Sequence, residues 1–417
     1  MSSAEREFDI MVYGATGYSG KLTAQYLARV AGDARIALAG RSRERLLAAR
    51  ESLGRSAHDW PLIVADAAQP APVQDMAARA RVVVTTVGPY TTYGLPVVAA
   101  CAKAGTDYVD LTGEVMFVRN SIDRYHEQAV DTGARIVVSC GFASIPSDLN
   151  VYQLYRRARG DGAGELCDTT LVFRSFFQGG GSGGTVASEF ESMRTASSDP
   201  EARHQMDDPY TLTPDRGAEP DLGPQHDFAW RRGSRIAPEL AGFWLGGLMW
   251  APHNTRVVRR SNALQNWPYG RRFRYSETMS LGKSFAAPVA SGVVTGTLAG
   301  AFALGTRHFR RVPQRWLAPL ARPGTGPGEK MRERGHYTAQ TYTTTTSGAR
   351  YLGTFAQQLD AYSGTGVLLA ECGLALAFDR GRLSDLRGVL TPAAAMGDAL
   401  LTRLPAAGVS MNTVRLS

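Results

Sequence analysis

The sequence has few cysteines, and they follow no recognisable pattern. Cys101, Cys140, Cys167 and Cys372 are scattered along the chain without a Cys-x-x-Cys pair. Neither they nor the seven histidines have the spacing of a metal site, so we expect no bound metal. The absence of a cysteine framework and a polar N-terminus without the apolar core of a signal peptide together predict a protein of the reducing cytoplasm.

Lysine is rare as well, because only four of the 46 basic residues are lysines. None of the four lies four residues after a tyrosine, which excludes the Tyr-x-x-x-Lys signature of short-chain dehydrogenases. The net charge of +8 and the pI near 9.4 favour an acidic partner. No compact basic stripe with interleaved aromatic residues is present, so we expect no nucleic-acid binding. An acidic carrier protein and an anionic lipid surface both remain open.

The most informative stretch is at residues 8–20, where an apolar strand runs into three regularly spaced glycines. Gly14, Gly17 and Gly20 follow residues 8–13, and a helical pattern begins at Lys21. In a dinucleotide-binding fold, the first glycine permits a sharp turn and the second lets the backbone approach a pyrophosphate. The third lets the helix pack closely against the strand. The pattern predicts a nucleotide-binding turn, and the alternative is a tight turn that binds no ligand.

The end of the second strand indicates which dinucleotide is bound. After residues 34–40 the chain reads Arg41-Ser42-Arg43, without the Asp or Glu that bonds the ribose 2′-hydroxyl of NAD. A guanidinium matches phosphate oxygens with two parallel hydrogen bonds and a serine hydroxyl adds a donor, so we expect NADP(H). The alternative is a solvated, arginine-rich helix start. The residues expected to bind the cofactor are Gly14, Ala15, Thr16, Gly17, Tyr18, Ser19, Gly20, Arg41, Ser42, Asp66, Val87, Gly88 and Pro89.

Alternation of strand and helix patterns continues to about residue 150. Further strands are expected at 61–66, 80–89, 106–114 and 134–141, with helices at 94–105 and 121–132. The predicted fold class is α/β, with an N-terminal Rossmann dinucleotide-binding domain over residues 1–150. Residues 151–417 are expected to form a C-terminal α+β domain that binds the substrate or a lipid. Its expected strands are 167–177, 254–261, 336–346 and 349–359, its helices 149–159, 185–196, 362–379 and 391–404, and residues 179–184 a glycine-rich joint.

One apolar segment, residues 284–305, carries no charged side chain and is long enough to cross a hydrocarbon core. Gly292, Gly296 and Gly300 recur at every fourth position, as in closely packed helices. Basic residues flank the segment on both sides. Three interpretations remain open: a buried helix or helical hairpin, an interfacial element that contacts a membrane or receives a lipid chain, and a membrane span, which Pro288 and the mild hydrophobicity disfavour.

Five motifs together resemble the saccharopine dehydrogenase-like oxidoreductases. They are Gly14–Gly20, the Ala-Gly-Arg-Ser of residues 39–42, Val-Gly-Pro-Tyr-x-x-Tyr-Gly at 87–94, Tyr-Val-Asp-Leu-Thr-Gly-Glu at 108–114, and Cys-Gly-Phe-x-Ser-Ile-Pro-Ser-Asp at 140–148. The likeness extends to residues 386–394 and is strongest to the mycobacterial trans-acting enoyl reductases. Where the family loop usually reads Gly-Phe-Asp-Ser, this chain has Ala143. This departure puts the role of that loop in doubt.

The resemblance implies NADPH-dependent reduction of an enoyl double bond on an acyl chain held by a polyketide synthase carrier domain. In that group the products are cell-envelope lipids of the phthiocerol and phenolphthiocerol type. The enolate oxygen that develops on the thioester needs hydrogen-bond donors. The candidate catalytic residues are Tyr90, Tyr93, Thr112 and Ser144, beside backbone N–H groups near Gly88 and Gly141. For each tyrosine, packing with the hydroxyl on the backbone is the alternative.

Glu114 follows a strand end, and two roles are open for it: it positions the substrate or it caps a turn. Two other functions also remain open for the whole chain. One is an NADP oxidoreductase of the same fold that reduces a carbonyl or an imine. The other is a non-catalytic NADPH-binding protein associated with a membrane or a lipid body. We expect a cytoplasmic protein, with attachment to the inner face of the plasma membrane as an open alternative, and the sequence indicates no oligomeric state.

Overall fold

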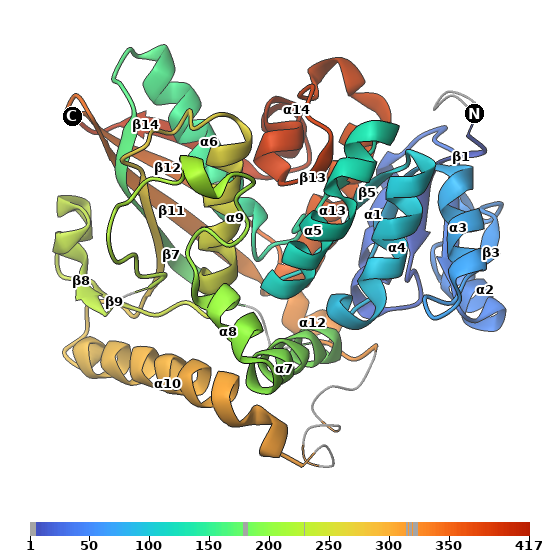
Figure 1. The fold of residues 1–417 in the computed structure, drawn as a ribbon, viewed down its shortest axis with the longest axis horizontal. Coiled ribbons are helices and arrows are strands. Elements are labelled where there is room, and N and C mark those ends of the chain that lie inside the picture. The colour runs from blue at the N-terminus through green and yellow to red at the C-terminus, as the bar shows by residue number, and fades with distance from the viewer. Residues whose placement is uncertain (1–5, 178–181, 229, 314–315, 317–318, 320–323) are drawn as a thin grey trace.

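Two seven-stranded sheets, A and B, each packed against helices, make up the protein in a computed structural model (Figure 1). The structure describes residues 6–177, 182–228, 230–313, 316, 319 and 324–417. Half of the glycine-rich joint predicted at 179–184, residues 179–181, and much of the basic stretch after residue 313 lie outside the described residues.

Sheet A is entirely parallel and has the strand order β13-β6-β5-β4-β1-β2-β3. The order reverses between β1 and β4, as in a doubly wound dinucleotide-binding sheet. The predicted fold class is therefore confirmed. The strands are β1 Phe8–Tyr13, β2 Ile36–Gly40, β3 Leu62–Val64, β4 Ala80–Thr85, β5 Asp107–Val109, β6 Arg135–Val137 and β13 Gly388–Leu390.

Helices cover both faces of sheet A because its strands are apolar on both sides. Ile10 and Val12 of β1 pack with α1 and α13, whereas Met11 and Tyr13 pack with α3, α4 and α5. Helix α13 comes from the far end of the chain and packs against α1 and β4, so the C-terminal region returns to the sheet that the first 150 residues begin. The helices around sheet A are α1 Tyr18–Val30, α2 Arg43–Ser52, α3 Pro70–Arg79, α4 Tyr90–Ala104, α5 Val115–Thr132, α13 Ala361–Phe378 and α14 Pro392–Ala406.

Sheet B is mixed and has the order β14-β12-β11-β7-β10-β9-β8. Its centre is β7, which pairs antiparallel with β11 and parallel with β10. The hairpin predicted at Ser347-Gly348 is present between β11 and β12, with Gly348 at φ +83°. The strands are β7 Leu166–Phe177, β8 Arg231–Arg232, β9 Trp244–Gly246, β10 Arg274–Ser280, β11 His336–Thr345, β12 Arg350–Gln357 and β14 Ser410–Arg415.

The remaining helices pack on sheet B or connect it to sheet A. They are α6 Ile145–Gly160, α7 Gly183–Ser198, α8 Pro200–Asp207, α9 Ala251–Leu264, α10 Ala287–His308 and α12 Glu329–Arg332. Short 3-10 helices are η2 Arg55–Ala57, η3 Arg216–Ala218, η4 Gly233–Arg235, η5 Pro238–Leu240, η6 Phe309–Arg311 and η7 Arg380–Arg382.

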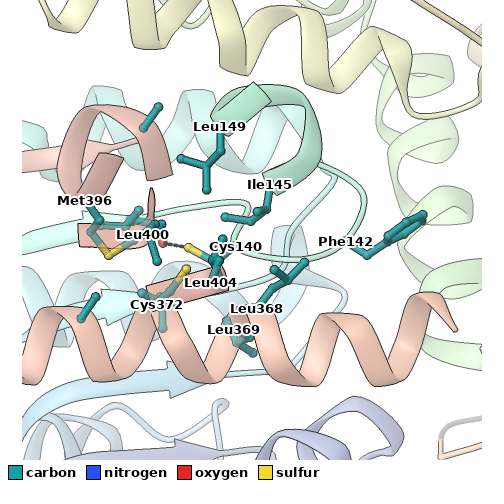
Figure 2. Close-up of a cluster of buried hydrophobic side chains, with 14 of the residues drawn as sticks. Cys140, Phe142, Ile145, Leu149, Leu368, Leu369, Cys372, Met396, Leu400 and Leu404 are labelled. Carbon is teal, nitrogen blue, oxygen red and sulfur yellow. Dashed lines mark hydrogen bonds between the residues drawn. The ribbon is translucent and has the colours of Figure 1, made fainter. Parts of the chain in front are cut away.

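One hydrophobic core joins the two sheets. Figure 2 shows its centre, where Cys140 and Cys372 lie among leucines of α6, α13 and α14. The same cluster includes Ile10 of sheet A and Phe355 of sheet B. The cysteines are free and buried, and they act as small apolar residues. Because this core is shared, neither sheet is packed independently of the other.

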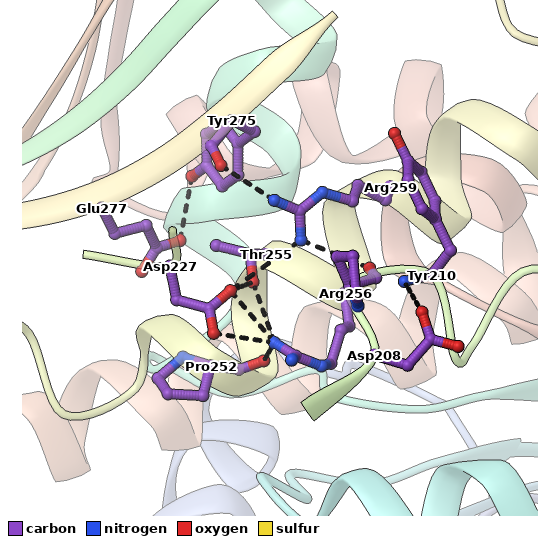
Figure 3. A network of polar contacts seen from close by, with 10 residues as sticks. Asp208, Tyr210, Asp227, Pro252, Thr255, Arg256, Arg259, Tyr275 and Glu277 are labelled. Carbon is purple, nitrogen blue, oxygen red and sulfur yellow. Dashed lines mark hydrogen bonds and ion pairs between the residues drawn. The ribbon is translucent and has the colours of Figure 1, made fainter. Parts of the chain in front are cut away.

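The strand expected at residues 254–261 is wrong, because this segment lies within helix α9. Pro252 starts the first turn, and the buried arginines of the helix find partners on distant segments (Figure 3). Arg256 donates to both carboxylate oxygens of Asp227 at 3.0 Å. Arg259 donates to the carbonyl of Tyr275 at 3.1 Å. These long-range partners decide the conformation, and the local pattern that predicted a strand does not.

The apolar segment forms α10 on the outside of the molecule, along the lower edge in Figure 1. The interpretation as a buried helix is wrong, because only 11% of the most apolar part of this helix is buried. A Cβ atom at Gly296 or Gly300 would meet nothing within 4 Å, so these glycines do not face a neighbouring helix. Helix α13 is shorter but similarly apolar, and 89% of it is buried because it belongs to the core of sheet A.

Candidate functional site

The carboxyl ends of four parallel strands bring the expected cofactor-binding residues to one edge of sheet A. Strands β1, β2, β3 and β4 end at Tyr13, Gly40, Val64 and Thr85, and Tyr13 is paired with both Ala39 and Thr85. The loops that follow contain the residues expected at the phosphates, the adenosine ribose and the nicotinamide end. Ligands of open α/β sheets bind at this edge, at the point where the strand order reverses.

The turn from β1 into α1 leaves no space for a side chain at position 14 or 20. Gly14 has φ +88°, and a Cβ there would lie 2.7 Å from Oγ1 of Thr86. A Cβ on Gly20 would lie 2.1 Å from the carbonyl oxygen of Gly14, so only glycine permits this close packing. Gly17 caps α1 without a side-chain bond, and the first turn contains no acidic residue. The first N–H groups of the helix are therefore available to an anionic phosphate.

Arg41 and Ser42 lie beyond β2, and Asp66 lies beyond β3. The hydroxyl of Tyr13 donates to the carbonyl of Ala65 at 3.2 Å. The pKa of Tyr13 is raised to about 12 by desolvation and by the charge of Asp66, against the charge of Arg41, which lowers it, so both charges lie close to this ring. Arg41 is exposed and forms no ion pair among the described residues. The Ser42 hydroxyl accepts from the N–H of Arg45 at 3.3 Å and caps α2, which leaves its own hydrogen to donate.

Tyr18 of the glycine turn contacts segments from the other end of the chain. Its hydroxyl donates to the carbonyl of Pro327 at 2.6 Å, and a Cβ on Gly326 would lie 2.5 Å from its ring. Its ring meets that of Tyr362, at the start of α13, edge to face at 5.3 Å. Sequence analysis missed Tyr362 and Pro327, because nothing local indicates that they meet a turn more than 300 residues away.

Glu114 caps the start of α4, which is the second of the two roles considered for it. One carboxylate oxygen accepts from the N–H of Tyr90 at 2.8 Å, and the other accepts from the N–H and hydroxyl of Thr91 at 2.7 and 2.6 Å. The Tyr90 side chain is buried against Phe117, and its hydroxyl donates to the carbonyl of Thr85 at 3.2 Å. This is the packing arrangement considered as the alternative for Tyr90.

The other three candidate catalytic residues differ in accessibility. Tyr93 is 37% exposed on α4. Thr112 is buried, and its hydroxyl accepts from the N–H of Glu114 at 3.1 Å. Ser144 is buried at the start of α6, and its hydroxyl donates to Oδ1 of Asn254 at 2.8 Å. The structure therefore brings all four to the same edge of sheet A, but only Tyr93 presents substantial side-chain surface.

Buried polar contacts hold the loop that carries Ala143. The side-chain N–H₂ group of Asn254 donates to the carbonyl of Ala143 at 2.6 Å and to Oε2 of Glu277 at 3.0 Å. The hydroxyl of Tyr275 donates to the other oxygen of Glu277 at 2.9 Å (Figure 3). Burial raises the pKa of Glu277 to about 7. Sequence analysis missed this network because it placed Asn254 in a strand.

Two other acidic groups near this loop support neighbouring loops. Asp110 accepts from the N–H groups of Ser139 at 2.8 Å and Thr112 at 3.0 Å. Asp148 accepts from the N–H of Ala393 at 2.8 Å, so it caps α14. Burial raises the pKa of both carboxyl groups to about 7. Within the described part of the chain no cluster of three metal-ligating side chains occurs.

Comparison with known proteins identifies relatives over the full length of the chain. Residues 10–137 match the family model of the saccharopine dehydrogenase NADP binding domain. The trans-acting enoyl reductases of Mycobacterium tuberculosis and Mycobacterium leprae are 69% and 66% identical to this chain, and the matches cover 100% of each chain. NADP(H) is thereby confirmed as the cofactor, and the resemblance drawn from the motifs is confirmed with it.

The fold is also similar to that of a solved structure. Apo saccharopine dehydrogenase (L-Glu forming) from Saccharomyces cerevisiae has a TM-score of 0.53 to this protein. The match covers 98% of this chain and 100% of that one at 12% identity, so it concerns the fold alone.

The buried acids make stability depend on pH. Glu277 holds its proton more tightly when folded, because its pKa is about 7, against about 4.3 in an unfolded chain. Its stabilising contribution is complete below about pH 4 and is lost as the pH rises through 7, and Asp110 and Asp148 act in the same direction. We expect the free energy of unfolding in urea to fall between about pH 5 and 8, and Glu277→Gln to flatten that fall by up to about 1.4 kcal/mol per pH unit. If the free energy of unfolding of this variant fell as steeply with pH as that of the unaltered protein, the raised pKa of Glu277 would be contradicted.

Proposed function

Since the chain belongs to the trans-acting enoyl reductase family, we propose that it reduces the carbon–carbon double bond of an enoyl thioester. The acyl group is attached to the carrier domain of a polyketide synthase that lacks this reducing step, in the biosynthesis of cell-envelope lipids of the phthiocerol and phenolphthiocerol type. The observation that carries the proposal is 69% identity over the full length to relatives with this name. The glycine turn supports NADPH as the reductant, and so does Arg41 at the end of β2, which has no ion pair within the part of the chain that the structure describes.

The residues at the edge of sheet A are suited to hold NADPH, which supplies a hydride when bound. Gly14, Gly17 and Gly20 expose the N–H groups of α1 to the pyrophosphate. Arg41 and Ser42 bind the 2′-phosphate, and Asp66 lies beside the adenosine. The loop Val87–Pro89, across the point of strand reversal, holds the nicotinamide end. Ala15, Thr16, Tyr18 and Ser19 complete the wall of the phosphate site.

Four hydroxyl groups were considered for the reacting end. Tyr90, Thr112 and Ser144 each bond to neighbouring groups inside the fold, and we propose that they hold the loops around Gly88 and Gly141 in place. Tyr93 is the hydroxyl among them that can reach a substrate, and we propose that it donates to the thioester oxygen as negative charge develops there.

An aromatic cluster beside the loop of Gly141 is suited to bind an acyl chain. The ring of Phe142 stacks on Phe176 at 5.6 Å and meets Trp250 at 5.4 Å and Tyr337 at 4.5 Å. Phe176 and Trp250 are only partly buried, so their surfaces remain open to an apolar ligand. We propose that this aromatic cluster binds the part of the acyl chain that lies beyond the double bond, on the side away from the thioester.

Arg41→Glu tests the cofactor site. The change removes charge-assisted hydrogen bonds worth about 1.5–3 kcal/mol and adds repulsion, so the Kd for NADPH should rise at least about tenfold. The Kd for NADH should change much less, because NADH has no 2′-phosphate. Fluorescence titration measures both constants. Arg124→Glu, an exposed change on α5, is the matched control and should leave both unchanged. An unaltered affinity for NADPH in Arg41→Glu would place the phosphate elsewhere.

Turnover by the purified protein tests the reaction itself. NADPH oxidation should occur with a long-chain 2-enoyl thioester, attached to a carrier domain or to its phosphopantetheine analogue. An oxoacid with an amino acid, which forms an imine, should give no oxidation. Activity with the oxoacid and amino acid alone would favour the imine-reducing alternative, and absence of turnover with every enoyl thioester would reject the proposed reaction.

We also propose that α10 attaches the protein peripherally to an anionic membrane surface. Phe285, Val289 and Val293 point outward and are 98%, 69% and 61% exposed. Residues 278–328 contain no Asp or Glu, while Lys283 precedes the helix, Arg307 lies in its last turn and further arginines follow it. An exposed apolar stripe between cationic ends fits a lipid surface with negative headgroups.

The contacts of α10 favour a position in the plane of the membrane rather than across it. The Ser291 hydroxyl donates to the carbonyl of Leu245 at 2.6 Å, and Thr295 accepts from the N–H of Gly247 at 2.9 Å. These bonds hold the inner side of α10 on β9. Crossing a bilayer would bring β9 and α7 into hydrocarbon, so only the outer side of α10 is free to enter the lipid.

Vesicle sedimentation tests the membrane contact. The protein should sediment with vesicles that contain phosphatidylglycerol and not with pure phosphatidylcholine. Val289→Glu with Val293→Glu should weaken binding at least about tenfold, because two apolar contacts of about 1.5 kcal/mol each are lost. Val414→Glu, at an apolar position on β14 that is 44% exposed, is the control. Equal sedimentation of the double variant and the unaltered protein, or no sedimentation of either, would reject the contact.

A further inference from the structure

A polar cavity lies on the face of sheet B that points away from α6 and α9. Leu171 and Phe173 of β7 point into the core shared with these helices, so the alternate residues Asp168 and Thr170 lie on the opposite face. Residues 224–237 contribute the other wall, and a cavity of about 490 Å³ lies between them and the strands. This volume is in the range of small-molecule binding sites.

Four arginines from four different elements line the cavity. They are Arg231 of β8, Arg235 of η4, Arg274 of β10 and Arg350 of β12. Asp168 is paired with Arg274 in the parallel register of β7 and β10, and it is the only acidic residue among the described residues of the lining. Glu239, which lies outside the lining, forms an ion pair with Arg350 at 2.6 Å. The four guanidinium groups thus have two carboxylates beside them, and two positive charges remain.

Two of these guanidinium groups have no partner within the fold. The side chains of Arg231 and Arg235 form no hydrogen bond or ion pair with any residue that the structure describes. Arg231 is half-buried, and burial lowers its pKa while the charge of Asp168 raises it. Removing a cation from water without giving it hydrogen bonds is costly, and a bound anion would offset that cost.

The rest of the lining is suited to the organic part of a ligand. Ile236 and Ala237 belong to a small apolar cluster that also contains Tyr342. The side-chain oxygen of Gln225 is buried and accepts no hydrogen bond within the described chain, so it is available to a hydroxyl or N–H group of a ligand. The cavity therefore combines cationic donors, apolar surface and a buried acceptor.

We propose that this cavity is a second ligand site, which binds a small organic phosphate. A phosphate monoester carries a charge of about −1.5 to −2 at pH 7, which matches the two positive charges that remain. Guanidinium groups bind phosphate oxygens through paired hydrogen bonds, and Arg231 and Arg235 have all their side-chain donors available. A cavity of this volume admits a small molecule and not a folded carrier domain.

The site is separate from the cofactor edge and does not depend on the proposed reduction. Along β7, Asp168 in the cavity and Phe176 in the aromatic cluster are eight residues apart, which is about 26 Å in a strand. The two positions also lie toward opposite ends of sheet B. A ligand in the cavity therefore does not occupy the place proposed for NADPH or for the reacting end of the substrate.

Calorimetric titration of the full chain with phenyl phosphate tests the site. The unaltered protein should bind one phenyl phosphate in the cavity, and inorganic phosphate should bind more weakly because it makes no apolar contact. Phenol, which has the ring without the phosphate, should give no measurable binding. Combining Arg231→Gln with Arg235→Gln should raise the Kd for phenyl phosphate at least about tenfold, because two charge-assisted contacts are lost.

Two control variants locate the binding. Arg232→Gln changes the next residue of β8, whose guanidinium lies over the ring of Trp244 at 5.1 Å and not in the cavity, so its Kd should be unchanged. Arg41→Glu alters the cofactor edge and should also bind phenyl phosphate like the unaltered protein. Arg235→Gln alone changes an exposed residue and should raise the Kd at least about threefold, which keeps the test available if the double variant does not fold.

The outcomes are distinct from those of the enoyl reductase assay, because no turnover is measured. Absence of binding to the unaltered protein, or equal binding by the folded double variant, would overturn the proposal. Loss of phenyl phosphate binding in Arg41→Glu alone would place the phosphate at the cofactor edge. If no soluble phosphate bound and the double variant instead lost its attachment to phosphatidylglycerol vesicles, the cavity would be a lipid headgroup site and the proposed small ligand would be wrong.

Discussion

The contact between Gly20 and the carbonyl oxygen of Gly14 is the constraint on which the rest of the site depends. A single Cβ at position 20 would lie 2.1 Å from that oxygen, so α1 begins directly against the end of β1 only because this residue is glycine. The closeness directs the free N–H groups of α1 to the edge of sheet A where β2, β3 and β4 also end. Arg41, Asp66 and Gly88 are placed around this turn by the parallel register. The NADP site is thus a consequence of sheet geometry around one tight turn.

The C-terminal third of the chain completes a site that the first 150 residues begin. Tyr362 of α13 contacts both Tyr18 and the start of α7, so the position of α7 over Gly88 is set by a helix that belongs to the core of sheet A. Asp148 caps α14, and β13 extends sheet A beyond β6. Since one core includes residues of both sheets, the edge proposed to bind NADP(H) and the aromatic cluster proposed to bind the acyl chain are held in a single arrangement. This suits an enzyme of the trans-acting enoyl reductase family, since reduction requires the cofactor and the substrate to be aligned.

Helices α10 and α13 illustrate what composition cannot decide. Both are long and apolar enough to cross a membrane, yet 11% of the most apolar part of α10 and 89% of α13 are buried. Helix α13 has a sheet face and α1 to cover, and Gly366 allows it to approach the backbone of Leu22. Helix α10 has β9 and α7 on its inner side only, which leaves its valines outside. The difference comes from the number of surfaces available to each helix and not from the helices themselves.

Local chemistry was enough to predict the Rossmann sheet, the glycine turn and the choice of NADP(H). Each depends on residues within about 20 positions of one another: a β-turn that only glycine permits, a strand end without an acid, and alternating strand and helix periods. The helical state of residues 254–261, the exposure of α10, the capping role of Glu114 and the place of α7 beside Gly88 could not be read in this way. Each of them depends on partners in other elements: Asp227 for Arg256, β9 for α10, Tyr90 for Glu114 and Gly88 for α7. Hydrogen bonds and steric limits between chain neighbours appear in the sequence, whereas burial and pairing between distant segments exist only once the chain has folded.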